Sequence, residues 1–199
     1  MINNLELIKP LLNFENEGDL YMLYIFKRKK DQPESKLSDH QSVRTIKSYC
    51  VESVEYLEKR MEEIRQLSEM FKARAYIHIQ KQNHKDVSLE MMVALAERIR
   101  NGQHNQKNLF NSIVGKLKIY EKRWVVDIDI KDEVVIKNIR TFIDGLRPGG
   151  SKCIAQIPTK NGYHLITNRF DVMEFKNKYP EVDIQKKNPT LLYYPNSLN

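Results

Sequence analysis

Cysteine is scarce in this sequence. Among 199 residues only Cys50 and Cys153 carry thiols, and both lie in segments of apolar pattern, far apart in the chain. Two distant cysteines imply no disulfide framework, and a thiol-based metal cluster needs ligands at closer spacing. We therefore predict two reduced cysteines in the core of a chain that folds without covalent staples.

Long hydrophobic runs are also missing. No apolar stretch approaches the length of about 20 residues that a transmembrane helix needs. Residues 1–6 lack the basic stretch and the apolar core of a signal peptide. There is no internal repeat and no biased tract. We expect a cytoplasmic protein with no membrane partner, folded as one domain over residues 1–199.

Positive charge exceeds negative charge. The formal net charge is +7, from 33 Lys and Arg against 26 Asp and Glu, and the sequence pI is near 9.2. A basic chain is suited to a polyanionic partner such as nucleic acid, because clustered cations release counterions from phosphates. The net charge becomes evidence for such a partner only if the Lys and Arg side chains gather around the carboxylates of a site.

The segment from Trp124 to Ile130 combines a buried strand with two acids. Alternate positions are apolar, which predicts that one face of the strand is buried. Asp127 and Asp129 share the other face, with Cα atoms about 7 Å apart. Carboxylates at this spacing are suited to a divalent metal ion.

A hairpin is predicted about thirty-five residues later. Residues 153–159 are mostly apolar, residues 163–167 form a second short strand, and Asn161-Gly162 is the dipeptide that a two-residue type I′ turn prefers. With that turn, Lys160 faces Tyr163 and Thr159 faces His164. Pro158 removes a ladder donor and favours a longer turn, so both turn lengths remain open.

The remaining pattern predicts an α+β fold. Helical periodicity covers residues 52–72, with Ser53 as its cap, then 88–100, capped by Ser88 or Asp86, and also 108–120, 132–146 and 171–179. Helix 88–100 has a distinct apolar set: Leu89, Met92, Val93, Leu95, Ala96 and Ile99. Strands are expected at 20–26, 42–51 and 75–80, followed by a last pair at 182–184 and 190–194.

A basic run, Lys27-Arg28-Lys29-Lys30-Asp31, follows the first predicted strand. One interpretation is a solvated end of the strand, and the other is a loop that contacts phosphates. Charge alone does not decide between them.

Three acids and a histidine on neighbouring strands match the needs of phosphoryl transfer. Asp183 adds a third strand-borne carboxylate to Asp127 and Asp129, and His164 lies on the intervening hairpin. Mg²⁺ or Mn²⁺ prefers oxygen ligands, and two such ions bind the attacking and leaving oxygens of an in-line displacement. A histidine near a triphosphate donates hydrogen bonds as charge develops.

The order Asp127-Ile128-Asp129, then Gly162-Tyr163-His164, then Val182-Asp183 resembles the catalytic core of the archaeo-eukaryotic primase superfamily, which includes primase-polymerases of plasmids and viruses. The resemblance covers roughly residues 75 to 194. It implies an RRM-like mixed or antiparallel sheet flanked by helices, a catalytic-type core over 75–199, beside an N-terminal α/β unit over 1–74.

The resemblance also implies roles for single residues. Asp127, Asp129 and Asp183 would bind Mg²⁺ or Mn²⁺, His164 would contact the incoming nucleotide, and Lys160 is a further candidate for nucleotide binding. The partners would be nucleoside triphosphates and a DNA or RNA strand. The expected activity is a metal-dependent nucleotidyltransferase of the DNA primase type, acting in replication or repair.

Two other functions fit the same residues. A nuclease or replication-initiation protein would use the same acids, with His164 as metal ligand or general base. A catalytically silent relative would bind nucleic acid through its basic residues and would not need the acids.

Overall fold

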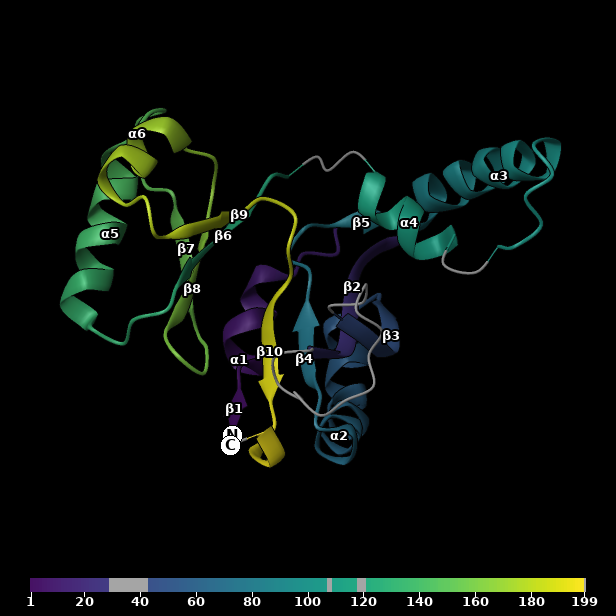
Figure 1. The fold of residues 1–199 in the computed structure, drawn as a ribbon, viewed down its shortest axis with the longest axis horizontal. Coiled ribbons are helices and arrows are strands. Elements are labelled where there is room, and N and C mark those ends of the chain that lie inside the picture. Colours follow the sequence, from purple (N-terminus) through teal and green to yellow (C-terminus); the bar gives the residue numbers. More distant parts are fainter. Residues whose placement is uncertain (29–42, 107–108, 118–120, 199) are drawn as a thin grey trace.

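The computed structural model describes residues 1–28, 43–106, 109–117 and 121–198, and within them the chain is an α+β protein with two antiparallel sheets (Figure 1). The strands are β1 (Ile2–Asn3), β2 (Asp19–Arg28), β3 (Val43–Val51), β4 (Arg74–Ile77), β5 (Gln82–Asn83), β6 (Trp124–Ile128), β7 (Cys153–Pro158), β8 (Tyr163–Thr167), β9 (Asp183–Gln185) and β10 (Thr190–Tyr194). The helices are α1 (Leu5–Ile8), α2 (Val54–Phe71), α3 (His84–Arg100), α4 (Leu109–Lys116), α5 (Glu133–Gly145) and α6 (Val172–Lys178), with 3₁₀ turns at Lys9–Leu11 and Asn196–Leu198.

The first sheet has the order β1-β10-β4-β2-β3, and β5 pairs with the start of β2. Strands β2 and β3 form the expected antiparallel hairpin, from Tyr21 opposite Val51 to Arg28 opposite Val43. Strand β2 is apolar on both faces because both faces are covered: Leu23 belongs to the main core, and Met22 packs with α3 and α4. A strand buried on both faces reads as a continuous hydrophobic run.

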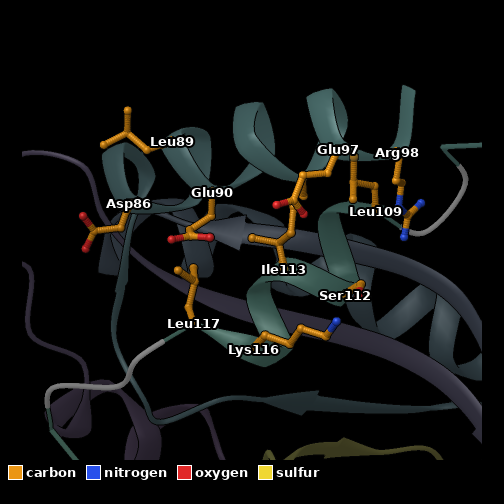
Figure 2. Close-up of a pocket in the computed structure, with 11 residues that line it drawn as sticks. Asp86, Leu89, Glu90, Glu97, Arg98, Leu109, Ser112, Ile113, Lys116 and Leu117 are labelled. Atoms are coloured by element: carbon orange, nitrogen blue, oxygen red, sulfur yellow. The ribbon is translucent and has the colours of Figure 1, made fainter. Parts of the chain in front are cut away.

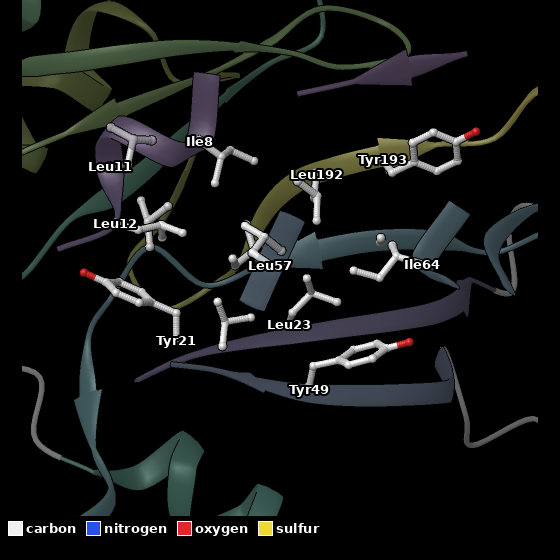
Figure 3. Packing of buried hydrophobic residues seen from close by; sticks show 14 of the residues in the cluster. Ile8, Leu11, Leu12, Tyr21, Leu23, Tyr49, Leu57, Ile64, Leu192 and Tyr193 are labelled. Carbon is white, nitrogen blue, oxygen red and sulfur yellow. The ribbon is translucent and has the colours of Figure 1, made fainter. Parts of the chain in front are cut away.

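Helix α2 covers one face of this sheet and confirms the predicted helix. Ser53 caps it by accepting a hydrogen bond from the backbone N–H of Tyr56 at 3.0 Å, and Lys72 ends it in the left-handed conformation. Its buried stripe includes Leu57 and Ile64. Figure 3 shows these two side chains within the core cluster.

The second sheet has the order β7-β8-β6-β9 and is built from the consecutive elements β6-α5-β7-β8-α6-β9. This is the split βαβ arrangement, in which every neighbouring pair is antiparallel. Helices α5 and α6 lie on one face (Figure 1). They begin at Asp132 and Asp171, whose carboxylates accept hydrogen bonds from backbone N–H groups of the first turn.

The other face of the second sheet turns toward the first. Val125, Ile157 and Ile166 join the core cluster that contains α1 and α2. Asn4 is 2% exposed, and its side-chain amide donates to the carbonyls of Pro158 and Leu191 at 2.9 Å each. One buried amide therefore ties the end of β7 to β10, and with it the two sheets.

Four expectations about elements need correction. The segments 182–184 and 190–194 are not a strand pair: β9 pairs with β6, whereas β10 lies between β1 and β4 in the first sheet. Helix α3 begins at His84, capped by the side chain of Asn83, and not near Ser88. Strand β6 ends at Ile128, so the second acid of its pair follows the strand. Strand β4 ends at Ile77, three residues earlier than expected.

Most of the apolar set of the predicted helix 88–100 is exposed in the structure, and Figure 2 shows the side chain of Leu89 pointing away from α4. Leu89, Met92, Val93, Leu95 and Ile99 are among the exposed large hydrophobic residues. Among the described residues, no helix is long and apolar enough to cross a membrane.

Candidate functional site

Three of the predicted site residues form a row across the second sheet. In the β6–β8 ladder Asp127 lies opposite His164, and in the β6–β9 ladder Asp127 lies opposite Asp183. Residues directly opposite in antiparallel strands place their side chains on the same face, about 5 Å apart at Cβ. Because Val126 and Ile128 point into the core under α5 and α6, this row lies on the face turned toward the first sheet.

His164 is buried, and each of its ring nitrogens faces a specific group. Nδ1 lies 3.0 Å from Oγ1 of Thr190, which belongs to β10 in the other sheet. Nε2 lies 3.5 Å from Oδ1 of Asp127. The second distance exceeds an ordinary hydrogen bond, so Nε2 faces the carboxylate without being firmly bound to it. The first contact fixes the ring orientation across the seam between the sheets.

Asp183 lies next to Asp127 but points outward. The side-chain amide of Gln185 donates to Oδ2 of Asp183 at 2.9 Å and lies 3.4 Å from Oδ2 of Asp127. The two carboxylates therefore share one donor. Asp183 itself is exposed and does not line the pocket described below.

The turn between β7 and β8 is longer than two residues. Pro158 pairs with Tyr163, and Ile157 lies opposite His164, where the shorter turn would have placed Thr159. The four-residue loop is closed by a hydrogen bond from the N–H of Thr159 to the carbonyl of Gly162 at 2.8 Å. The expected two-residue type I′ turn is therefore wrong, and the alternative that Pro158 favoured is correct.

Gly162 is needed for a different reason from the one its dipeptide suggests. A Cβ at this position would lie 1.8 Å from the carbonyl oxygen of Ile128 and 2.7 Å from the backbone nitrogen of Ile130. The glycine therefore lets the turn pack directly on the backbone that carries Asp129. This contact brings the turn residues Lys160 and Asn161 next to the end of the acidic strand.

A pocket of about 350 Å³ lies where the two sheets meet. Four of the five predicted site residues line it, and Asp183 does not. Its lining is Arg28, Arg74, Tyr76, Asp127, Asp129, Thr159, Lys160, Asn161, His164 and Leu191. Strands β2, β4 and β10 of the first sheet thus face β6, β8 and the hairpin turn of the second. The site consists of two carboxylates and a histidine on one side, with arginines on the other.

The arginines are held by an aromatic group. The hydroxyl of Tyr76 lies 3.3 Å from Nη1 of Arg28 and 3.4 Å from Nη1 of Arg74. The Tyr76 ring stacks on Phe26 with centroids 4.7 Å apart. Arg74 also lies over the ring of Tyr194, 4.8 Å from its centroid. These contacts hold both guanidinium groups at the pocket wall.

Lys160 completes a group of three cationic side chains. Its ammonium lies 3.3 Å from the carbonyl of Leu198 and 5.4 Å from the centroid of the Tyr194 ring. Lys160 itself is exposed, so it meets the pocket from the solvent side. Arg28, Arg74 and Lys160 therefore surround the same space as Asp127 and Asp129.

Reasoning from the sequence missed several of these residues. Arg28 belongs to the basic run after the first strand, for which a phosphate-contacting loop was one interpretation; residues 29–31 of that run lie outside the described residues. Arg74, Tyr76 and Thr190 carry no comparable signal. Arg74 and Tyr76 line the pocket, and Thr190 contacts His164, only because β4 and β10 lie next to each other inside the first sheet.

The donor set of the pocket fits a Mg²⁺ or Mn²⁺ ion that is shared with a substrate. The described residues contain no group of three or more His, Cys, Asp or Glu side chains arranged to hold a metal ion. Mg²⁺ in nucleotide sites, however, is commonly bound by one or two carboxylates, several waters and the phosphates of the substrate. Asp127 and Asp129 supply two carboxylates to such a site.

Comparison with known proteins gives no relative: no family model matches the sequence, and neither the curated proteins nor the solved structures include a significant match.

Proposed function

We propose that this protein is a metal-dependent nucleotidyltransferase of the primase-polymerase type, which joins nucleotides from nucleoside triphosphates to a DNA or RNA strand in the cytoplasm. The single observation that supports this most is the composition of the pocket between the sheets. Two carboxylates, a histidine and three cationic side chains line one space of about 350 Å³. A metal–triphosphate complex carries positive charge on the ion and negative charge on the phosphates. The carboxylates of the pocket complement the first, and its cationic side chains complement the second.

The cationic side would bind the triphosphate. A guanidinium presents donors in a planar fork that matches phosphate oxygens, and paired charges of this kind form short, strong hydrogen bonds. Arg28 and Arg74 come from adjacent strands and share the hydroxyl of Tyr76, so both donor groups are positioned before the ligand arrives. Lys160 would close the phosphate site from the hairpin turn.

His164 would donate a hydrogen bond to a phosphate oxygen. When the hydroxyl of Thr190 donates to Nδ1, the proton of the neutral ring lies on Nε2, the nitrogen that faces the pocket. The contact from Nε2 to Asp127 is long, at 3.5 Å, and leaves that donor free to turn to a ligand. A donor in this position would stabilise charge that develops on the leaving pyrophosphate.

Asp127 and Asp129 would hold the metal ion. When bound, the ion would neutralise phosphate charge and bring the attacking 3′-hydroxyl and the α-phosphate together. The protein itself contributes the fixed carboxylates, a phosphate site on the opposite wall and a shared pocket that excludes part of the solvent. Asp183 would contribute through its neighbour Asp127, with which it shares the amide of Gln185.

Isothermal titration of a nucleoside triphosphate, with and without Mn²⁺, tests this function. We expect Mn²⁺ to strengthen binding to the wild type and to have no effect on Asp127→Asn/Asp129→Asn. Without metal the double variant should bind the triphosphate at least as well as the wild type, because two negative charges near the phosphate site are gone. Asp86→Ala/Glu90→Ala, which removes two acids from α3, is the matched control and should behave like the wild type.

Primer extension then separates the alternatives. If the protein extends a primer and the extension is lost when Asp127 or Arg74 is replaced, the result supports nucleotidyl transfer. Cleavage of DNA without added nucleotides would instead show the nuclease alternative. Binding of nucleic acid that survives a chelator and persists in Asp127→Ala, without any extension, would show a silent relative.

A further inference from the structure

The 3₁₀ turn at Asn196–Leu198, here called the 196–198 turn, follows β10 and contacts the hairpin turn of the second sheet. The carbonyl of Leu198 accepts two hydrogen bonds, from the ammonium of Lys160 at 3.3 Å and from the hydroxyl of Tyr194 at 3.0 Å. The Lys160 ammonium also lies 5.4 Å from the centroid of the Tyr194 ring. A carbonyl and an aromatic ring therefore hold a side chain that is otherwise exposed at the pocket.

Glu69, in the last turn of α2, fixes the backbone of the 196–198 turn. Its Oε1 accepts a hydrogen bond from the N–H of Asn196 at 2.9 Å, and its Oε2 accepts one from the N–H of Ser197 at 3.1 Å. The hydroxyl of Ser197 donates to the backbone carbonyl of Glu69 at 3.2 Å. The hydroxyl of Tyr193 donates to Oε1 at 3.0 Å. One carboxylate thus holds the turn whose last carbonyl reaches Lys160.

The charge of Glu69 makes this attachment strong. Burial raises the pKa of the Glu69 carboxyl, but hydrogen bonds from Asn196, Ser197 and Tyr193 outweigh it, and the pKa lies below its usual value. Hydrogen bonds to an ionised acceptor are roughly twice as strong as those between neutral groups. The end of a helix disfavours a negative charge, because the helix dipole is negative there. The donors of the 196–198 turn compensate the carboxylate in this position.

Holding Lys160 in place matters for binding a phosphate. An ammonium has three N–H donors, so the bond to Leu198 leaves the others for a ligand. A long lysine side chain loses rotamer freedom when it binds, and ordering one such side chain weakens affinity roughly twofold to tenfold. A side chain that is already held before the ligand arrives avoids most of this loss.

We infer that Glu69 is a positioning residue of the pocket between the sheets: through the 196–198 turn it holds Lys160 where the ammonium meets a phosphate of the ligand. Glu69 is not part of the pocket lining and acts through the carbonyl of Leu198. The inference rests on the proposed function, because it takes a triphosphate as the ligand of Lys160.

Isothermal titration of a nucleoside triphosphate with Mn²⁺ tests the effect on binding. Glu69→Ala should weaken binding about twofold to tenfold, the factor for ordering one long side chain. Tyr194→Phe removes the hydroxyl that donates to Leu198, keeps the ring beside Lys160 and should weaken binding in the same direction. This second variant leaves Glu69 in place, so it tests the same contact even if Glu69→Ala is too unstable to titrate.

A double-mutant cycle separates positioning from a merely structural role. In a Lys160→Ala background, Glu69→Ala should weaken binding no further, because the side chain that it positions is gone. A structural role would lower the affinity by the same factor in both backgrounds. Glu62→Ala is the matched control: it removes a carboxylate from the same helix, bound to Arg65 and Gln66 and not to the 196–198 turn, and should bind like the wild type.

A measurement without ligand keeps the inference distinguishable from the proposed function. An ammonium held by a carbonyl exchanges its protons with water more slowly than a freely moving one. Lys160 should therefore give an ammonium signal in proton–nitrogen NMR spectra, assigned by its absence from Lys160→Arg. The signal should disappear in Glu69→Ala and in Tyr194→Phe, and remain in Glu62→Ala.

Three results would overturn the inference. The first is an ammonium signal of Lys160 that both Glu69→Ala and Tyr194→Phe leave unchanged. The second is a triphosphate affinity that neither variant lowers. The third is a loss of affinity in Glu69→Ala that persists undiminished without Lys160. A wild type that binds no triphosphate would instead refute the proposed function, and loss of the signal in both variants would still show that Glu69 positions Lys160.

Discussion

Replacing Gly162 by alanine is the sharpest test of the geometry at the hairpin turn. The added Cβ would lie 1.8 Å from the carbonyl oxygen of Ile128, and real Cβ atoms essentially never approach another atom within 3.0 Å. The turn must therefore move by more than 1 Å from the end of β6. The obstructing atoms are backbone, so no side-chain rotation relieves the contact.

The expected cost follows from overpacking. Inserting a methyl group into a tightly packed contact costs about 1 to 3 kcal/mol, and the upper part of this range fits a clash with backbone. For a chain of this length, each kcal/mol lowers Tm by about 2 to 4 °C. We expect Gly162→Ala to unfold about 4 to 12 °C below the wild type. Because the turn carries Lys160, the Mn²⁺-dependent increase in triphosphate affinity should also fall.

Gly149→Ala is the matched control, since a Cβ there meets nothing within 4 Å. Its free energy of unfolding should differ from that of the wild type by no more than about 0.5 kcal/mol. Urea unfolding of the three proteins, with the same m value, gives the comparison. If Gly162→Ala proved as stable as Gly149→Ala, the close packing of the turn on β6 would be refuted.

Three further predictions concern the seam between the sheets and the buried polar groups. Asn4→Ala should lower the free energy of unfolding by about 2 to 3 kcal/mol in urea titrations, because it leaves two buried carbonyls without their donor. Thr190→Val should weaken Mn²⁺-dependent triphosphate binding by releasing His164, and Thr190→Ser should restore it. Burial lowers the pKa of His78 from 6.5 to about 4, so the folded state loses stability as the pH falls between these values. His78→Phe should remove up to about 3 kcal/mol of that loss when unfolding is measured at pH 7 and pH 4.

Local sequence determined much of the secondary structure. The three- and four-residue periodicity and the cap Ser53 predicted α2, and alternating apolar positions predicted β6. The period of a strand also determined that Asp127 points away from the buried Val126 and Ile128. These features depend on neighbours in the chain, so no knowledge of the fold is needed to predict them.

The place of the last strand was decided by the tertiary structure. The segment 190–194 is mostly apolar and looks like a partner for the segment before it. It enters the first sheet between β1 and β4 because that position buries both of its faces. Only this arrangement brings Thr190 to His164, across the seam between the sheets.

The pocket between the sheets and helix α3 show the same contrast between what the sequence determines and what the tertiary structure decides. The sequence by itself determined the residue types and the faces of Asp127, His164 and Asp183, because these follow from the strand period. Only the tertiary structure decided that Arg28 and Arg74 face them, since long-range strand pairing has no local signal. It also left the periodic apolar stripe of α3 exposed: periodicity predicts an apolar face, but only the packed fold determines what covers it.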